Sequence, residues 1–83
     1  MVRIGVIEDD SNMREMTKKI ISKVIQGYED VKCKEFESAE EFQQEKADYD
    51  IVILDIDLPG MNGIELGKRI FRNSKDTIII YLT

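Results

Sequence analysis

The stretch DIVILDIDLPGMNGIEL, residues 50–66, decides the fold and carries the candidate site. Its four consecutive apolar residues, 51–54, are typical of a strand that is covered on both faces. The run ends at Asp55, and a charge that follows a buried strand is unfavourable unless it is paired or functional. Pro59-Gly60 then turns the chain, and a helical pattern begins at Ile64. The stretch therefore predicts a strand, a loop and a helix, with Asp55 at the end of the strand.

Outside this stretch, strands and helices are predicted to alternate along the chain. Met13 and Met16 belong to an apolar stripe with steps of three and four residues, which predicts a helix and places both side chains in the core. Strands are expected at residues 2–7, 31–36 (an edge strand) and 77–82, and a short helix is expected to start at the capping-box Ser38. The order β-α-β-α-β-α-β predicts one α/β domain over residues 1–83, a doubly wound parallel sheet with helices on both faces.

The bulk composition restricts the class of protein. Eighty-three residues suffice for one small domain, and the net charge of −5 argues against a nucleic-acid-binding surface. No apolar run approaches the ~18 residues of a membrane span, and no signal-peptide pattern opens the chain. Cys33 is the single cysteine, which fits a reducing compartment, so a cytoplasmic domain is expected. The sequence has no histidine, which excludes His-based triads and His metal ligands.

The C-terminal run of the sequence raises a further expectation. Residues 78–82 form a strand-like apolar segment that reaches Thr83 with no helix after it. We therefore expect a C-terminally incomplete domain, or one whose last strand is covered by something else. An uncovered fourth strand predicts self-association through its open edge.

Oxygen-bearing side chains follow three of the predicted strands. Glu8 and Asp9 follow the first, Asp55 ends the third, and Thr83 follows the fourth. Ligands of open α/β sheets bind beyond the carboxyl ends of the strands, so these residues converge if the first and third strands are neighbours. Three carboxylates in one crevice repel each other unless a cation joins them, and Mg²⁺ prefers such oxygen ligands. The sequence therefore predicts a Mg²⁺ site at this edge.

The expected chemistry of this site is phosphoryl transfer. Bound Mg²⁺ recruits phosphate, and a carboxylate such as Asp55 can attack phosphorus to form an aspartyl phosphate. The Thr83 hydroxyl is then placed to hydrogen-bond a phosphoryl oxygen. Asp10 is expected to cap a helix and not to bind the metal, because Asp commonly fills that position. Asp57 lies beyond the end of the strand, so it is expected to offer its backbone carbonyl instead of its carboxylate.

Three motifs together, VIEDDSNMR, DIVILDIDLPGMNGIEL and IIIYLT, resemble the receiver domain of bacterial two-component response regulators. The resemblance covers the whole chain and implies a flavodoxin-like (CheY-like) strand order 2-1-3-4, without the family's last strand and helices. The roles that it implies are Asp55 as phosphoacceptor, Asp9 as direct Mg²⁺ ligand, Glu8 as ligand through water, Asp57 as backbone-carbonyl ligand, Thr83 as switch hydroxyl, and Pro59 and Gly63 as part of the loop that shapes the site.

The resemblance also implies partners and an output. A histidine kinase would be the phosphodonor, and the full-length protein would carry a DNA-binding output domain. The sequence of residues 55–66 is similar to the corresponding segment of regulators with a LytTR-type output. The chain itself would be a phosphoacceptor and not an enzyme acting on other substrates, with no direct contact to nucleic acid or membrane. The family's fifth strand ends in a lysine that has no counterpart in this sequence, which implies impaired phosphorylation of this chain alone.

Two other functions stay open from the residues. The segment ILDID resembles the D-x-D motif of haloacid-dehalogenase-like phosphatases, in which Asp55 would be the nucleophile and Asp57 the acid/base. That family usually continues differently after the acid pair, where this chain has Leu58-Pro59, and it assigns no role to the upstream acids. The other hypothesis is a structural or interaction module without chemistry of its own.

Overall fold

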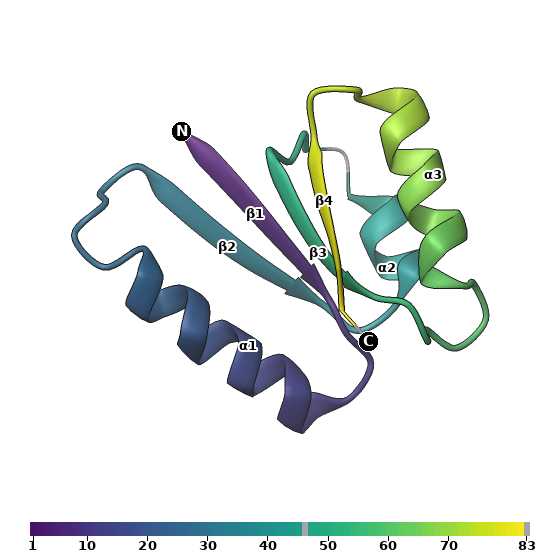
Figure 1. Ribbon diagram of the computed structural model, residues 1–83, viewed down its shortest axis with the longest axis horizontal. Coiled ribbons are helices and arrows are strands. Elements are labelled where there is room, and N and C mark those ends of the chain that lie inside the picture. Colours follow the sequence, from purple (N-terminus) through teal and green to yellow (C-terminus); the bar gives the residue numbers. More distant parts are fainter. Residues whose placement is uncertain (46, 83) are drawn as a thin grey trace.

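The computed structural model describes residues 1–45 and 47–82. They form a four-stranded parallel sheet in the order β2-β1-β3-β4, with three helices (Figure 1). The elements are, in chain order, β1 (Val2–Ile7), α1 (Ser11–Val24), β2 (Val31–Phe36), α2 (Ala39–Gln44), β3 (Ile51–Asp55), α3 (Gly63–Asn73) and β4 (Ile78–Leu82). The predicted alternation of strands and helices and the strand order 2-1-3-4 are confirmed.

Each helix begins at a side chain that accepts hydrogen bonds from its first turn. Asp10 accepts from two N–H groups of α1 (2.8 and 3.1 Å), which confirms its predicted capping role. Ser38 accepts from the N–H of Glu41 at the start of α2, as the capping box predicts. Asn62 accepts from the N–H of Ile64 at the start of α3 (2.7 Å). These caps satisfy backbone donors that have no partner within the helix, and they order the loops that follow β1 and β3.

Helices cover both faces of the sheet. α1 packs against β1 and β2 on one face, while α2 and α3 lie on the other (Figure 1). Neighbouring strand residues point to opposite faces, so Val6 belongs to the cluster with Ile21 of α1. The next residue, Ile7, belongs to the cluster with Phe36 and Leu66 on the α2 and α3 face. β1 and β3 are the inner strands, which gives their carboxyl ends a rigid frame.

The predicted core position of Met13 and Met16 is wrong. These side chains are 45% and 56% exposed, and Ile21 is the residue of α1 that is buried. The helix is turned so that Arg14 faces β2, where its guanidinium pairs with Glu35. Apolar residues occupy two adjacent sides of this helix, so their spacing in the sequence did not identify the side that meets the sheet.

Both edges of the sheet match the sequence expectations. β2, at one edge, carries the charged residues Lys32, Lys34 and Glu35, so charges lie on both of its faces. β4 lies at the other edge, where Ile78 and Ile80 are 59% and 43% exposed. Ile79 points to the opposite face and packs against the α2 and α3 cluster. Among the described residues, β4 is therefore an edge strand with exposed apolar side chains, as predicted.

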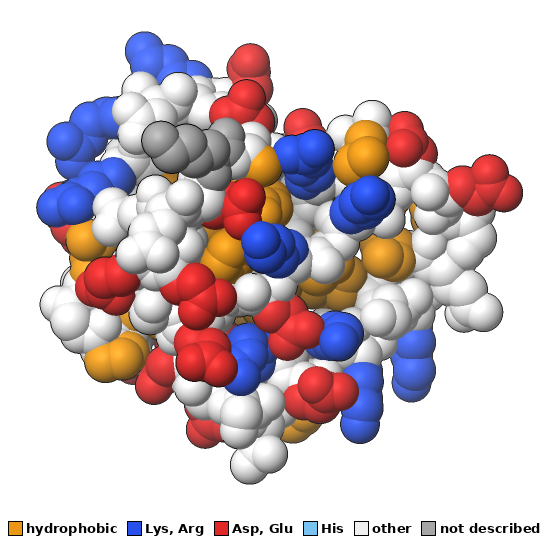
Figure 2. Space-filling model, turned by 180° about the vertical axis from the view of Figure 1, so that it is seen from behind, with side chains coloured by type: hydrophobic (Ala, Val, Ile, Leu, Met, Phe, Trp, Pro, Cys, Tyr) orange, Lys and Arg blue, Asp and Glu red, His pale blue; other side chains and the backbone are white. Residues whose placement is uncertain are grey.

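The surface carries charges of both signs. On the face drawn in Figure 2, Lys and Arg side chains are mixed with Asp and Glu, and hydrophobic side chains are visible between them. Within the described residues, each helix is too short or too polar to cross a membrane.

Candidate functional site

The parallel pairing of β1 with β3 brings the predicted acids together. Ile7 is aligned with Leu54, so the residues that follow these two positions meet at the carboxyl edge of the sheet. One carboxylate oxygen each of Glu8, Asp9 and Asp55 lies within 4.8 Å of the other two. The predicted convergence of acids that are distant in the sequence is confirmed.

Glu8 is the buried member of this acidic cluster, with 7% of its surface exposed. Its carboxylate accepts a hydrogen bond from the N–H of Asp10 (3.4 Å). The pKa of Glu8 is raised from 4.5 to about 7, chiefly by burial and then by hydrogen bonding to Asp55 and the negative charge of that residue. The N–H of Asp10 offsets part of this increase. The raised pKa indicates that the cluster accommodates a full set of negative charges poorly without a counter-ion.

The loop after β3 holds the Asp55 side chain in place. The N–H of Asp57 donates to Asp55 Oδ1 (3.1 Å), which orients the carboxylate at the end of the strand. Gly60 has a φ of +83°, a conformation that glycine adopts readily, and the N–H of the next residue, Met61, donates to the Pro59 carbonyl (3.1 Å). The N–H of Gly63 donates to the carbonyl of Ile56 (2.8 Å) and begins α3 directly against this loop. The loop is thus fixed by hydrogen bonds at both of its ends.

A cavity of about 330 Å³ opens over the acidic cluster. Its lining consists of Glu8, Asp9, Asp10, Met13, Asp55, Asp57 and Leu82. All the charged groups in this lining are acidic, so the cavity favours cations. The carbonyl of Leu82 accepts from the N–H of Ile56 (3.1 Å), which places the end of β4 beside the site. Thr83, the predicted switch hydroxyl, lies outside the described residues.

The side chains of the acidic cluster fit a hard divalent cation. Carboxylate oxygens are the ligands that Mg²⁺ prefers, and the cavity has room for the water molecules that Mg²⁺ retains. A divalent charge would also relieve the repulsion that contributes to the raised pKa of Glu8. The residues predicted to bind Mg²⁺ therefore form a suitable donor set in the folded chain.

Arg14 is a residue of this region that the sequence analysis missed. Its guanidinium donates to the backbone carbonyl of Glu8 (2.8 Å) and lies 3.6 and 3.5 Å from the carboxylates of Glu35 and Glu37. A cation close to a helix N-terminus is opposed by the helix dipole. The acidic cap Asp10 stands at the same end of α1 and offsets this effect. The sequence therefore offers no local signal for Arg14, because its hydrogen bond goes to a backbone carbonyl and its ion pair with Glu35 joins residues of different elements.

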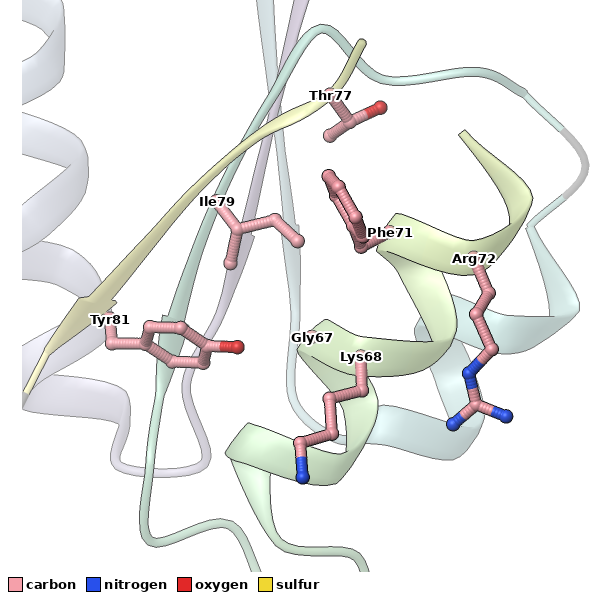
Figure 3. Close-up of a pocket in the computed structure, with 7 residues that line it drawn as sticks. All are labelled: Gly67, Lys68, Phe71, Arg72, Thr77, Ile79 and Tyr81. Carbon is pink, nitrogen blue, oxygen red and sulfur yellow. The ribbon is translucent and has the colours of Figure 1, made fainter. Parts of the chain in front are cut away.

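A second hollow, of about 500 Å³, lies between α3 and β4 (Figure 3). It is lined by Gly67, Lys68, Phe71, Arg72, Thr77, Ile79 and Tyr81. Its charged residues are both basic, so the hollow lacks the carboxylate ligands of the acidic site. In Figure 3 the ring of Tyr81 extends from β4 toward α3. This hollow between α3 and β4 is therefore distinct from the candidate metal site.

The chain belongs to the response regulator receiver domain family, whose sequence profile matches residues 4–83. This membership confirms the family predicted from the three motifs. It also agrees with the strand order 2-1-3-4 and with the acidic cluster at the carboxyl edge of the sheet. The chain is thus a receiver domain of the two-component type, a signalling domain. The comparisons give no support to the haloacid-dehalogenase alternative.

Two curated relatives illustrate the match. YrkP, an uncharacterized transcriptional regulatory protein of Bacillus subtilis, is 36% identical over 81 residues, which is 98% of this chain and 33% of YrkP. The chemotaxis protein CheY1 of Helicobacter pylori is 34% identical over 85 residues, which is 99% of this chain and 67% of CheY1. The chain thus spans one third of one relative and two thirds of the other.

Solved structures share the fold. The response regulator TrrA of Thermotoga maritima, in complex with Mg²⁺-BeF, matches with a TM-score of 0.85 and 36% identity, over 100% of this chain and 70% of the TrrA chain. A structure of the histidine kinase ThkA in complex with TrrA matches with a TM-score of 0.77 and 39% identity. That match covers 100% of this chain and 69% of the other.

Proposed function

We propose that this chain is a phosphoacceptor domain that receives a phosphoryl group from a histidine kinase on Asp55. The observation that carries the proposal is the clustering of Glu8, Asp9 and Asp55 at the carboxyl ends of neighbouring strands. In this proposal Asp9 and Asp55 bind Mg²⁺ directly, Asp57 binds it through its backbone carbonyl, and Glu8 binds it through water. The Mg²⁺-BeF complex of TrrA supports the assignment of the metal.

Asp55 is the nucleophile of the proposed transfer. The Asp57 N–H donates a hydrogen bond to Asp55 Oδ1. Asp55 Oδ2 is therefore the oxygen that attacks the phosphorus of phosphohistidine. The new P–O bond forms as the P–N bond breaks, and the imidazole keeps the electron pair and takes a proton from water. Bound Mg²⁺ would supply positive charge to the phosphoryl oxygens. The chain's own contribution is to orient the carboxylate at the end of a rigid strand.

Phosphorylation would be read out at the end of β4. In this proposal Thr83 donates its hydroxyl hydrogen to a phosphoryl oxygen. The carbonyl of the preceding residue, Leu82, accepts a hydrogen bond from the N–H of Ile56, the residue after Asp55. This bond between the neighbours of Thr83 and Asp55 supports the proposed coupling. The added charge would then shift the loops between two arrangements. Thr83 is thus assigned as the residue that couples phosphorylation to the last strand.

The proposed partners are a kinase and an output domain. Support for a histidine kinase comes from the complex of ThkA with TrrA. Support for transcriptional output comes from the name of the relative YrkP, of which this chain spans 33%. The sequence of residues 55–66 favours a LytTR-type DNA-binding domain as the output domain. With a net charge of −5, this chain itself makes no nucleic-acid contact in the proposal. A cytoplasmic location agrees with the single Cys33.

We also propose that a second copy of the chain pairs with β4. This strand presents the exposed Ile78 and Ile80 at the edge of the sheet. Backbone groups on the free side of an edge strand pair readily with another strand, and exposed apolar side chains strengthen such pairing. The pairing is independent of phosphorylation and is tested separately below.

A phosphorylation assay tests the principal proposal. The chain is incubated with acetyl phosphate, with and without Mg²⁺, and any adduct is located by mass spectrometry. Because the sequence has no counterpart of the family's lysine, we expect only a low yield of adduct on Asp55, which requires Mg²⁺ and is absent from Asp55→Asn. The matched control Asp57→Asn keeps the adduct, because Asp57 contributes backbone atoms. An adduct that persists in Asp55→Asn, or that forms equally without Mg²⁺, would contradict the proposal.

A further inference from the structure

We infer that Arg14 is a positioning residue for the metal site, acting through the backbone of Glu8. The inference rests on the proposed Mg²⁺ site and adds a residue that touches neither the metal nor the phosphoryl group. Arg14 comes from α1, and its guanidinium donates from Nη1 to the Glu8 carbonyl (2.8 Å). It therefore contacts Glu8, which belongs to the acidic cluster together with the next residue, Asp9.

The backbone of Glu8 is held from both sides. Its N–H donates to the carbonyl of Phe36 (3.0 Å) and so continues the pairing of β1 with β2. Its carbonyl lies past the last residue of β1, where a buried acceptor needs a partner from another part of the chain. Arg14 is that partner. With both groups bonded, the peptide planes on either side of Glu8 are fixed, and so is the direction of its Cα–Cβ bond.

The guanidinium is itself anchored on β2. Its Nε lies 3.6 Å from Glu35 Oε2, and its Nη2 lies 3.5 Å from Glu37 Oε1. The side chains of Arg14 and Glu35 are 15% and 25% exposed, so water screens this pair only in part, whereas the pair with the 71% exposed Glu37 contributes less. Arginine suits this position because its planar group carries several donors in a fixed geometry. Arg14 thus connects the loop after β1 to the end of β2.

This arrangement leaves the metal ligands free. Among the described residues, the recorded ion pairs of Arg14 are with Glu35 and Glu37 and not with the carboxylates of the acidic cluster. A cation that paired with Asp9 or Asp55 would compete with Mg²⁺, whereas a cation bonded to the Glu8 carbonyl does not. Arg14 can therefore resist the mutual repulsion of the acids without occupying their oxygens.

The test compares two variants that each remove one positive charge from α1. Arg14→Met removes the bond to the Glu8 carbonyl. Lys18→Met, one turn further on, removes a different cation from the same Glu35 (Nζ to Oε1, 3.2 Å) without touching Glu8. Mg²⁺ affinity is measured by isothermal titration calorimetry on chains shown to be folded by circular dichroism. We expect Arg14→Met to weaken Mg²⁺ binding about 10-fold, as is common for residues that orient metal ligands, and Lys18→Met to change it less than about twofold.

Further variants separate the possible failures. Asp9→Asn removes a proposed ligand, so a wild-type chain that binds Mg²⁺ no better than Asp9→Asn overturns the proposed function and this inference together. If Asp9→Asn loses binding while Arg14→Met keeps wild-type affinity, the inference alone is wrong. Equal losses in Arg14→Met and Lys18→Met would also overturn it, because they would indicate a general charge effect. Should Arg14→Met fail to fold, Arg14→Leu replaces it, because leucine also cannot donate to the Glu8 carbonyl, and wild-type affinity in that variant contradicts the inference.

Discussion

Gly63 lies in direct contact with the backbone of Asp55, the proposed phosphoacceptor. A Cβ atom at position 63 would stand 2.0 Å from the Asp55 carbonyl oxygen and 2.8 Å from the Cα of Ile56. Both obstacles are backbone atoms, so they cannot move aside as the end of a side chain can. The first residue of α3 and the last residue of β3 therefore approach each other as closely as glycine alone allows, and this contact sets the distance between the helix and the site.

Gly63→Ala should destabilise the chain and disturb the site. The added methyl group must displace the loop that carries Asp55, and forcing extra atoms into a packed region typically costs about 1–3 kcal/mol. Urea denaturation measures the free energy of unfolding. Lys68→Ala, on the exposed side of the same helix, is the control and should change it by less than about 0.5 kcal/mol. Equal stability of Gly63→Ala and the wild type would contradict the close contact.

Mg²⁺ should stabilise the folded chain through the acidic cluster. A ligand that binds only the folded state adds about 2.7 kcal/mol when its concentration is 100 times its Kd. We expect Mg²⁺ to raise the Tm of the wild type and to leave the Tm of Asp9→Ala unchanged, as measured by thermal denaturation followed by circular dichroism. Asp76→Ala removes an exposed acid of the loop before β4 and should respond to Mg²⁺ as the wild type does. An equal rise in Asp9→Ala would show that the cation binds elsewhere.

The stability of the metal-free chain should fall as the pH rises from about 4.5 to about 7. In this interval Glu8 holds its proton in the folded chain, where its pKa is about 7, but loses it in the unfolded chain near its ordinary value of 4.5. The folded state then binds more protons than the unfolded state, so the contribution of Glu8 to the free energy of unfolding decreases with pH. The full effect is about 3 kcal/mol at most. It should be present at the acidic end of the interval and lost above the raised pKa.

Urea denaturation at a series of pH values, without divalent cations, measures this dependence. Glu8→Gln cannot titrate and should remove the part of the slope that Glu8 causes. Glu41→Gln, an exposed acid of α2, should leave the slope unchanged. A slope that is identical in Glu8→Gln and the wild type would refute the assignment of the proton to Glu8.

Association of two chains through β4 should depend on the exposed apolar side chains of this edge strand. Ile80→Lys places a charge on this strand, and charged residues on edge strands discourage pairing between chains. Light scattering over a range of concentrations should show a mass above that of the monomer for the wild type and a monomer for Ile80→Lys. Val24→Lys makes the same change at an exposed position of α1 and should leave the association intact. A wild type that stays monomeric at all concentrations would contradict the proposed pairing.

Much of this fold follows from local patterns. The run at residues 51–54, the turn at Pro59-Gly60 and the capping box at Ser38 each predicted the element that the structure contains, because periodicity and capping act over a few residues. The orientation of α1 did not follow from such a pattern. Met13 and Ile21 are both apolar and both helical, and only the packing of α1 against β2, with Arg14 directed toward Glu35, decides that Ile21 is the buried one.

The site divides in the same way. Carboxylates at strand ends are visible in the sequence, and their chemistry follows from their type. Their distance from one another depends on which strands become neighbours, and that depends on the packing of the whole sheet: Asp9 and Asp55 meet because β1 pairs with β3. The bond from Arg14 to the Glu8 carbonyl likewise joins a side chain to a backbone atom, and backbone atoms carry no residue-specific signal in a sequence. Residue types thus define the available chemistry, while long-range strand pairing determines which groups act together.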